Sequence, residues 1–160
     1  MYRIGMGFDA HRFSRGRKLV LGGVEIPFEF GLEGHSDADV LTHAICDAVL
    51  GAIGERDIGS HFPDSDSRYK GASSLILLEE VMALSNSKGF KIENIDSVVV
   101  CEKPRLGEYI PQIKKRIAPV AGISEESLGI KATTTDKMGF TGRGEGIAAY
   151  AVVLMKKINI

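Results

Sequence analysis

The sequence contains only two cysteines, carries almost no net charge and has no long apolar run. Because no apolar segment approaches the roughly 18 residues that a membrane-spanning helix needs, we expect no transmembrane segment. Cys46 and Cys101 stand apart rather than in a CxxC pair, which favours buried thiols in a reducing compartment over a disulfide framework. A formal net charge of -1 gives no electrostatic basis for binding nucleic acid or an anionic membrane. The chain enters a strand pattern at once, which predicts no signal or transit peptide and a cytoplasmic protein.

What the sequence does contain is the pattern of a folded domain. Its 160 residues, 44% hydrophobic and 26% charged, fit one domain, residues 1–160, with a full core. Strand patterns cover 2–9, 18–21, 24–26, 95–101, 129–134 and 147–155, and helical patterns cover 37–53, 74–87 and 108–121. This order predicts an α+β fold in which a mixed β-sheet carries its helices on one face. We expect the apolar strand 147–155 at the centre of that sheet.

Asp9 and His11 lie two residues apart near the end of the first predicted strand. Alternate strand side chains share a face, so a carboxylate and an imidazole project side by side, as two ligands of Zn²⁺ would. We expect the third ligand to be His43, since three protein ligands leave one position open, as in catalytic zinc sites. Two simpler interpretations remain open. One is an Asp–His hydrogen bond at a strand end, and the other is a helix histidine in which His43 bonds Asp39 at i, i+4.

His35 and Ser36 precede the helix predicted over 37–53. Ser36 suits the N-cap of that helix, and the free N–H groups of a helix N-terminus attract phosphate. His35 could add a donor there, or it could be a loop residue with a local bond. The polar segment 55–71 is longer than most loops inside a compact domain, which indicates a functional or mobile segment.

A second polar cluster, Thr133–Lys137, combines three hydroxyls, a carboxylate and an ammonium group at a strand end. Asp136 could hold a hard cation such as Mg²⁺, which usually binds one or two carboxylates together with substrate phosphates. In the glycine-rich segment 139–146, Arg143 offers a bidentate fork for a phosphate. The alternatives are β-branched residues that simply fill a strand, and a flexible hairpin connection. Together the clusters suggest a two-cation site for a phosphate-rich substrate.

Four segments, Gly7–His11, His35–His43, Asp57–Asp64 and Lys131–Gly146, carry a resemblance to a known family. On these segments the chain resembles the 2-C-methyl-D-erythritol 2,4-cyclodiphosphate synthases over essentially its full length. The resemblance implies a bacterial homotrimer with active sites between subunits, a phosphorus–oxygen lyase of the non-mevalonate isoprenoid pathway. Its substrate would be 4-diphosphocytidyl-2-C-methyl-D-erythritol 2-phosphate. The 2-phosphate would attack the inner phosphorus of the diphosphate, releasing CMP and forming the cyclic diphosphate.

The resemblance also implies the roles of single residues. It implies that Asp9, His11 and His43 bind Zn²⁺ and that Asp136 binds Mg²⁺ or Mn²⁺. Two residues would orient and stabilise the reacting phosphates as catalytic residues, namely His35 and Thr134. The residues that would contact substrate are, on the methylerythritol side, Asp57, Ile58, Gly59, Phe62, Pro63, Asp64, Ser65 and Asp66; on the cytidine side, Cys101, Pro104, Arg105, Leu106, Gly107, Thr133, Thr134, Thr135 and Asp136; and in addition Asp9, His11, His35, Ser36, Phe140 and Arg143.

Three features depart from the family pattern. In the segment 101–105, only Pro104 and the basic residue after it match the family clearly. Asp136 stands where the family usually has Glu, which is one methylene longer. Met6 stands where some members have His, near a central channel of the trimer that binds an isoprenoid diphosphate in some relatives; Phe8, Arg143 and Glu145 would lie nearby. Two other functions are compatible with the same ligands. They are a metal-dependent phosphohydrolase that releases inorganic phosphate, and a non-catalytic binding module for isoprenoid diphosphates.

Overall fold

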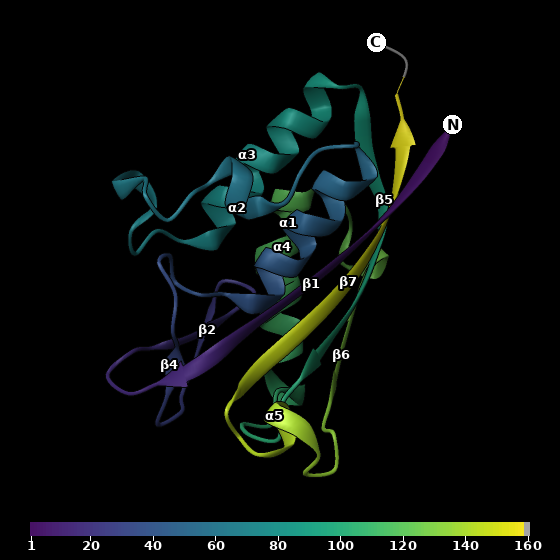
Figure 1. The fold of residues 1–160 in the computed structure, drawn as a ribbon. Helices are drawn as coiled ribbons and strands as arrows, with labels where there is room; N and C mark the ends of the chain where they lie inside the picture. The colour runs from purple at the N-terminus through teal and green to yellow at the C-terminus, as the bar shows by residue number, and fades with distance from the viewer. Residues whose placement is uncertain (159–160) are drawn as a thin grey trace.

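The chain folds into one mixed β-sheet backed by a layer of helices (Figure 1). The computed structural model describes residues 1–158. The strands are β1 (Tyr2–Ser14), β2 (Leu19–Leu21), β3 (Val24–Ile26), β4 (Gly31–Leu32), β5 (Phe90–Val100), β6 (Leu128–Thr133) and β7 (Gly146–Lys157). The helices are α1 (Val40–Ala52), α2 (Ile58–His61), α3 (Ser74–Ser87), α4 (Ile110–Ala121) and α5 (Gly139–Gly142), with 3-10 turns η1 (Ser67–Tyr69), η2 (Gly107–Tyr109) and η3 (Glu125–Ser127).

The main sheet has the strand order β4-β1-β7-β5-β6. All neighbours are antiparallel except β5 and β6, which are parallel, so the sheet is mixed as predicted. The predicted central position of the last strand is confirmed, because β7 pairs with β1 on one side and β5 on the other. β2 and β3 form a separate hairpin, where Gly22 and Gly23 take positive φ angles that suit glycine. The predicted α+β class and its helix-covered face are therefore confirmed.

α1 packs directly on the backbone of β1, because small residues face each other across the contact. A Cβ atom added to Gly5 would lie 1.9 Å from the carbonyl oxygen of Ala48, and one added to Gly7 would lie 1.8 Å from that of Ala44. Such distances are far inside van der Waals contact, so only glycine allows this approach. The close packing brings the first turn of α1 next to the helix-covered face of β1, where alternate side chains such as Asp9 project.

The start of the first long helix differs from the prediction. α1 begins at Val40 with Asp39 as its N-cap, rather than at residue 37 with Ser36 as the cap. The buried carboxylate of Asp39 accepts hydrogen bonds from the Thr42 N–H and hydroxyl and from the N–H groups of Gly22 and Gly23. Those donors from the hairpin, distant in sequence, stabilise Asp39 at the cap, which explains why local pattern alone misses the boundary.

Other boundaries also differ from the predictions. β1 continues beyond residue 9 to Ser14, because it pairs with β7 as far as Arg12 and then with β4. Asp9 and His11 therefore lie inside a strand rather than at its end. β5 begins at Phe90 rather than 95, since β7 pairs with it from Lys157 onwards. The polar segment 55–71 contains α2 and η1, and the glycine-rich segment contains α5.

Among residues 1–158, no helix or strand covers the face of the sheet opposite the helices. Its large apolar side chains are 47% to 74% exposed, and they alternate along β1 and β7: Tyr2, Ile4, Met6, Phe8, Tyr150 and Val152. We call this set the uncovered face. An apolar patch on two adjacent strands is typical of a surface that binds another protein. Within residues 1–158, no helix has the length and apolar character needed to cross a membrane.

Candidate functional site

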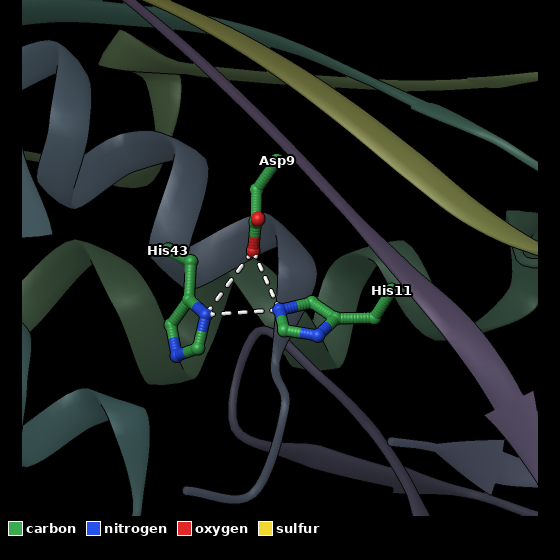
Figure 2. Close-up of side chains that lie close together, drawn as sticks. All are labelled: Asp9, His11 and His43. Atoms are coloured by element: carbon green, nitrogen blue, oxygen red, sulfur yellow. Dashed lines mark hydrogen bonds and ion pairs between the residues drawn. The ribbon is translucent and has the colours of Figure 1, made fainter. Parts of the chain in front are cut away.

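Three side chains from β1 and α1 meet at the candidate metal centre (Figure 2). Asp9 Oδ2 lies 2.8 Å from His11 Nε2 and 3.1 Å from His43 Nδ1. The two ring nitrogens lie 3.3 Å apart. One ligand atom from each residue lies within 4.8 Å of the others, so the structure brings together the three residues that the sequence predicted for zinc.

The interpretation of His43 as a helix histidine bonded to Asp39 does not describe its side chain. The backbone N–H of His43 donates to the Asp39 carbonyl at 3.0 Å, as in any helix turn. The ring points instead toward Asp9, from which it is separated by 34 positions in the sequence. The close packing of α1 on β1 makes that contact possible.

The carboxylate and the two imidazoles of this cluster stabilise one another's charged forms. Burial disfavours ionisation of Asp9, but hydrogen bonds and positive charge from His11 and His43 outweigh it and lower the Asp9 pKa below 3.8. Burial also disfavours a charged His11, yet Asp9 outweighs it and raises the His11 pKa above 6.5. One carboxylate oxygen and two imidazole nitrogens form a donor set that Zn²⁺ takes in catalytic sites. The residues therefore fit a zinc ion.

Both histidines are also held at their outer nitrogens. His11 Nδ1 lies 2.8 Å from the Glu33 carbonyl oxygen. His43 Nε2 lies 2.7 Å from Ser74 Oγ and 3.1 Å from Ser36 Oγ. Such partners fix the ring orientation of metal-binding histidines. No motif in the sequence marks Ser74 as a partner of His43, because Ser74 is 31 residues away and reaches the ring only through the packing of α3 on α1.

A cavity of about 210 Å³ opens beside the cluster. It is lined by Asp9, His11, Gly34, His35, Ser36, His43, Ile58, Gly59, Phe62, Asp64, Tyr69 and Leu77. We call it the triad pocket. One wall carries the metal-binding atoms, and the other is partly apolar because α2 and the residues after it contribute Ile58 and Phe62. Of the residues predicted on the methylerythritol side, Asp57, Pro63, Ser65 and Asp66 lie outside the lining of this cavity.

His35 and Ser36 reach the triad pocket in a different way from the prediction. They do not lie at the N-terminus of α1, which begins at Val40, so any contact with a phosphate would come from the loop before the helix and not from the helix end. His35 Nε2 lies 3.0 Å from the Asp66 carbonyl oxygen. Arg17 donates to the carbonyl oxygens of Gly34 and Ser36, at 2.6 and 2.8 Å, and so holds this loop beside the cavity. Sequence reasoning did not identify Arg17.

A second cavity, of about 300 Å³, lies at the ends of β5 and β6. It is lined by Cys101, Glu102, Pro104, Arg105, Leu106, Gly107, Ile110, Ala132, Thr133 and Thr134. We call it the strand-end pocket. All the residues predicted for the cytidine side line it except Thr135 and Asp136. Burial, with the charge of Glu102, raises the pKa of the Cys101 thiol to about 11, so the thiol is a neutral wall residue.

Glu102 shapes the turn beside the strand-end pocket. Its Oε1 accepts hydrogen bonds from the backbone N–H groups of Thr135 and Lys137, at 3.2 and 3.1 Å. Asp136 and Lys137 take positive φ angles of 50° and 64°, which few non-glycine residues adopt. The carboxylate of Glu102 therefore stabilises a turn that presents the Asp136 side chain outward. Sequence reasoning assigned Glu102 no role.

The two pockets lie on different strands of the same sheet. Asp9 pairs with Ala149, Ala149 with Val99, and Val99 with Ala132, so three strand spacings separate β1 from β6. At about 4.8 Å per spacing, the separation is roughly 14 Å. Within one chain, Thr134 and Asp136 therefore do not join the metal-binding cluster.

Phe140 and Arg143 line neither pocket. Phe140 contributes to a small cavity with His11 and Gly146. The guanidinium of Arg143 bonds Glu145 at 3.1 Å. Both side chains are exposed in the single chain.

Comparison with known proteins identifies the chain at the family level. The sequence pattern of the YgbB family matches residues 2–156. The chain belongs to the YgbB family. A relative from Geotalea uraniireducens, named 2-C-methyl-D-erythritol 2,4-cyclodiphosphate synthase, is 57% identical over 97% of this chain and 99% of its own. A protein of the same name from Syntrophotalea carbinolica is 54% identical over 98% of this chain and 96% of its own. Like these YgbB relatives, the chain is an enzyme of the lyase class.

Solved structures agree with the YgbB assignment. IspF of Plasmodium falciparum, in a complex with CDP, matches with a TM-score of 0.86 and 33% identity, over 99% of this chain and 97% of that one. The bifunctional IspDF from Campylobacter jejuni matches with a TM-score of 0.95 and 40% identity over 99% of this chain. This chain spans 43% of that bifunctional protein.

Proposed function

We propose that this YgbB-family enzyme converts 4-diphosphocytidyl-2-C-methyl-D-erythritol 2-phosphate into 2-C-methyl-D-erythritol 2,4-cyclodiphosphate, with release of CMP, in the non-mevalonate pathway. The observation that carries the proposal is the cluster of Asp9, His11 and His43 beside a cavity, in a chain 57% identical to a relative of that name. The relatives and the resemblance to them supply the substrate, and the geometry supplies a site with the required chemistry.

The reaction asks the protein for positioning and charge neutralisation rather than for a nucleophile. The substrate's own 2-phosphate forms the new P–O bond to the inner phosphorus, and the bond to the CMP phosphate breaks. Asp9, His11 and His43 would hold Zn²⁺, and Asp136 would hold Mg²⁺ or Mn²⁺. When bound, the two cations would neutralise phosphate charge and polarise P–O bonds. His35 and Thr134 would donate hydrogen bonds that orient the phosphates.

The two pockets divide the substrate between them in this proposal. The triad pocket would take the methylerythritol part against Ile58 and Phe62, and the strand-end pocket would take the cytidine part. The CDP in the Plasmodium falciparum complex supports a nucleotide-linked substrate. Because β1 and β6 are about 14 Å apart within one chain, the strand-end pocket of one subunit would serve the triad pocket of its neighbour.

A homotrimer would satisfy that requirement. The uncovered face, where Ile4 is 74% and Met6 71% exposed, offers the apolar surface for association. A heterologous contact repeated three times closes a ring, so every triad pocket would meet a strand-end pocket. Met6 and Phe8 would then face the central channel, where some relatives bind an isoprenoid diphosphate.

The test is ³¹P NMR of the purified protein with this substrate, Zn²⁺ and Mg²⁺, before and after chelation. We expect a pair of coupled cyclic diphosphate signals that grows together with the CMP signal and stops when chelator is added. Release of inorganic phosphate would instead identify a metal-dependent hydrolase. Unchanged substrate in the presence of both metals would contradict the proposed reaction.

A further inference from the structure

The ring of His43 is held from both sides. Its Nδ1 faces the metal-binding cluster, 3.1 Å from Asp9 Oδ2 and 3.3 Å from His11 Nε2. Its Nε2 faces away, 2.7 Å from the hydroxyl oxygen of Ser74. Ser74 is the first residue of α3 and is fully buried, so this contact forms inside the protein rather than at its surface.

Ser74 is in turn bound by Asp37. The Ser74 hydroxyl donates a hydrogen bond to Asp37 Oδ1, and the Ser74 N–H donates to Asp37 Oδ2 at 3.0 Å. Asp37 Oδ1 also accepts from the Asp39 N–H at 3.1 Å. The carboxylate of Asp37, in the loop before α1, thus bridges the start of α3 to the cap of α1.

The direction of these hydrogen bonds follows from the groups involved. A carboxylate only accepts, so the proton of the Ser74 hydroxyl is committed to Asp37. The oxygen of Ser74 then presents a lone pair to His43, and Nε2 of His43 must be the donor. A neutral imidazole with its proton on Nε2 carries its lone pair on Nδ1, which is the atom that faces the cluster.

His11 shows the same arrangement with a backbone partner. Its Nδ1 faces the Glu33 carbonyl oxygen at 2.8 Å, so Nδ1 is the donor and Nε2 carries the lone pair. Asp9 Oδ2, His11 Nε2 and His43 Nδ1 then direct three lone pairs at one point, with separations of 2.8 to 3.3 Å. Such an arrangement needs positive charge between the three atoms, which a bound metal ion supplies when no proton occupies that position.

We propose that Asp37 and Ser74 are positioning residues for the metal centre, forming a carboxylate–hydroxyl–imidazole relay that fixes His43 as an Nδ1 ligand. The inference rests on the metal centre of the proposed function and adds two residues to it. A hydrogen-bond partner on the outer nitrogen of a metal-binding histidine raises the basicity of the ligand nitrogen and holds the ring in place. Ser36, 3.1 Å from the same Nε2, is a longer and secondary partner.

The experiment measures the dissociation constant for Zn²⁺ of the purified full-length chain, by competition with a chromogenic chelator. We expect Ser74→Ala to bind Zn²⁺ about 10- to 100-fold more weakly than wild type, the range usual for second partners of zinc ligands. We expect a smaller loss, about tenfold, for Asp37→Asn, which keeps the Ser74 hydroxyl in place.

Ser85→Ala is the matched control. Ser85 is another fully buried serine of α3, and its hydroxyl donates to the Phe90 carbonyl oxygen at 3.0 Å, away from the cluster. Ser74→Ala loses two side-chain hydrogen bonds, with Asp37 and His43, and Ser85→Ala loses one, so thermal stability should fall in both variants and further in Ser74→Ala. Only Ser74→Ala should lose zinc affinity, whereas Ser85→Ala should stay within about twofold of wild type.

A double variant and a spectroscopic signature separate the relay from a general loosening of the loop. Once Ser74 is alanine, Asp37→Asn should weaken Zn²⁺ binding little further, because the Ser74 hydroxyl is the link between the carboxylate and the His43 ring. In zinc-loaded protein with ¹⁵N-labelled histidine, the Nε2–H signal of His43 should be protected from solvent exchange in wild type and Ser85→Ala. It should be lost in Ser74→Ala.

The outcomes distinguish the two proposals. A wild-type chain that binds no Zn²⁺ would overturn the metal centre and with it the proposed function. Zinc binding by wild type together with an unchanged affinity in Ser74→Ala would overturn the relay alone. Independent losses in the double variant would also overturn it. If Ser74→Ala does not fold, the affinity of Asp37→Asn decides, and an unchanged value there contradicts the relay.

Discussion

The triad pocket and the strand-end pocket are built in opposite ways. In the triad pocket, Asp9, His11 and His43 are partly buried, and the outer ring nitrogens have partners within the same chain. In the strand-end pocket, Thr133 and Thr134 are exposed, as is Asp136 in the turn beside it. One half of the proposed site is thus preorganised by the core of a single chain, and the other half remains a surface. Under the proposed function, metal binding would then depend on the fold of one chain, whereas turnover would depend on association.

The largest effect should come from removing a metal ligand. We expect His43→Ala to lose bound Zn²⁺ and to lower kcat/KM by roughly 10³-fold or more, because Lewis-acid stabilisation of phosphate charge supplies several kcal/mol. Metal analysis of the purified protein and ³¹P turnover assays measure the two losses. His61→Ala is the control, since His61 pairs with Glu55 outside the triad pocket. Full zinc and full turnover in His43→Ala would contradict the metal assignment.

A charge introduced on the uncovered face should lower turnover while zinc binding in the triad pocket stays intact. We expect Ile4→Lys to dissociate the oligomer, because an ammonium group would be buried against an apolar partner surface. Turnover should fall by about 10²-fold, as misplacement of a substrate-binding group does, while Zn²⁺ remains bound. Light scattering and metal analysis of the same sample test both statements. A monomeric Ile4→Lys variant with wild-type turnover would show that one chain holds a complete site.

Lowering the pH should weaken zinc binding in the triad pocket. The pKa of His11 is raised above 6.5, although burial opposes this, because Asp9 stabilises the charged ring. A proton on His11 Nε2 occupies the position of the metal, so Zn²⁺ affinity should fall as pH drops below that raised pKa. One proton exchanged per zinc corresponds to about tenfold weaker binding for each pH unit. Chelator competition between pH 6 and pH 8 measures the slope; an affinity independent of pH over this range would argue against His11 as a ligand.

The smallest effect should come from the turn of the strand-end pocket. Glu102→Gln replaces the carboxylate that accepts from the N–H groups of Thr135 and Lys137 with a neutral amide. We expect CDP to bind about three- to tenfold more weakly, as for one weakened charge-assisted hydrogen bond, with Zn²⁺ affinity unchanged. Calorimetry with CDP measures this change. A parallel loss of zinc affinity would mean that the two pockets are coupled within one chain.

The sequence predicted elements best where the signal was local. The apolar run 147–155 correctly predicted the central strand β7, and Gly22–Gly23 predicted the hairpin. The start of α1 could not be read in this way. Asp37 resembles a residue of a first helical turn, but it bonds Ser74, which lies 37 residues further along the chain.

The residues of the candidate site were likewise predictable only where a short motif or the family resemblance marked them. The Asp-x-His spacing and the resemblance pointed to Asp9, His11 and His43, and the fold brings them together. Arg17, Ser74 and Glu102 act through contacts between distant segments, so no spacing in the sequence marks them. Nor does the sequence alone reveal that Thr133 and Asp9 lie on strands separated by two others, because strand order is a property of the whole sheet.

The glycine contact between β1 and α1 has a consequence for how much change the protein tolerates. The distance from Asp9 to His43 is set where two backbones touch, at Gly5 and Gly7, and not by the size of core side chains. Substitutions elsewhere in the core can alter volume and rotamers while the distance between the two ligands stays the same. At Gly7 a single added methyl group would displace the helix that carries His43. Most substitutions in the core should therefore leave the geometry of the metal centre unchanged, whereas substitutions at Gly5 and Gly7 should disturb it.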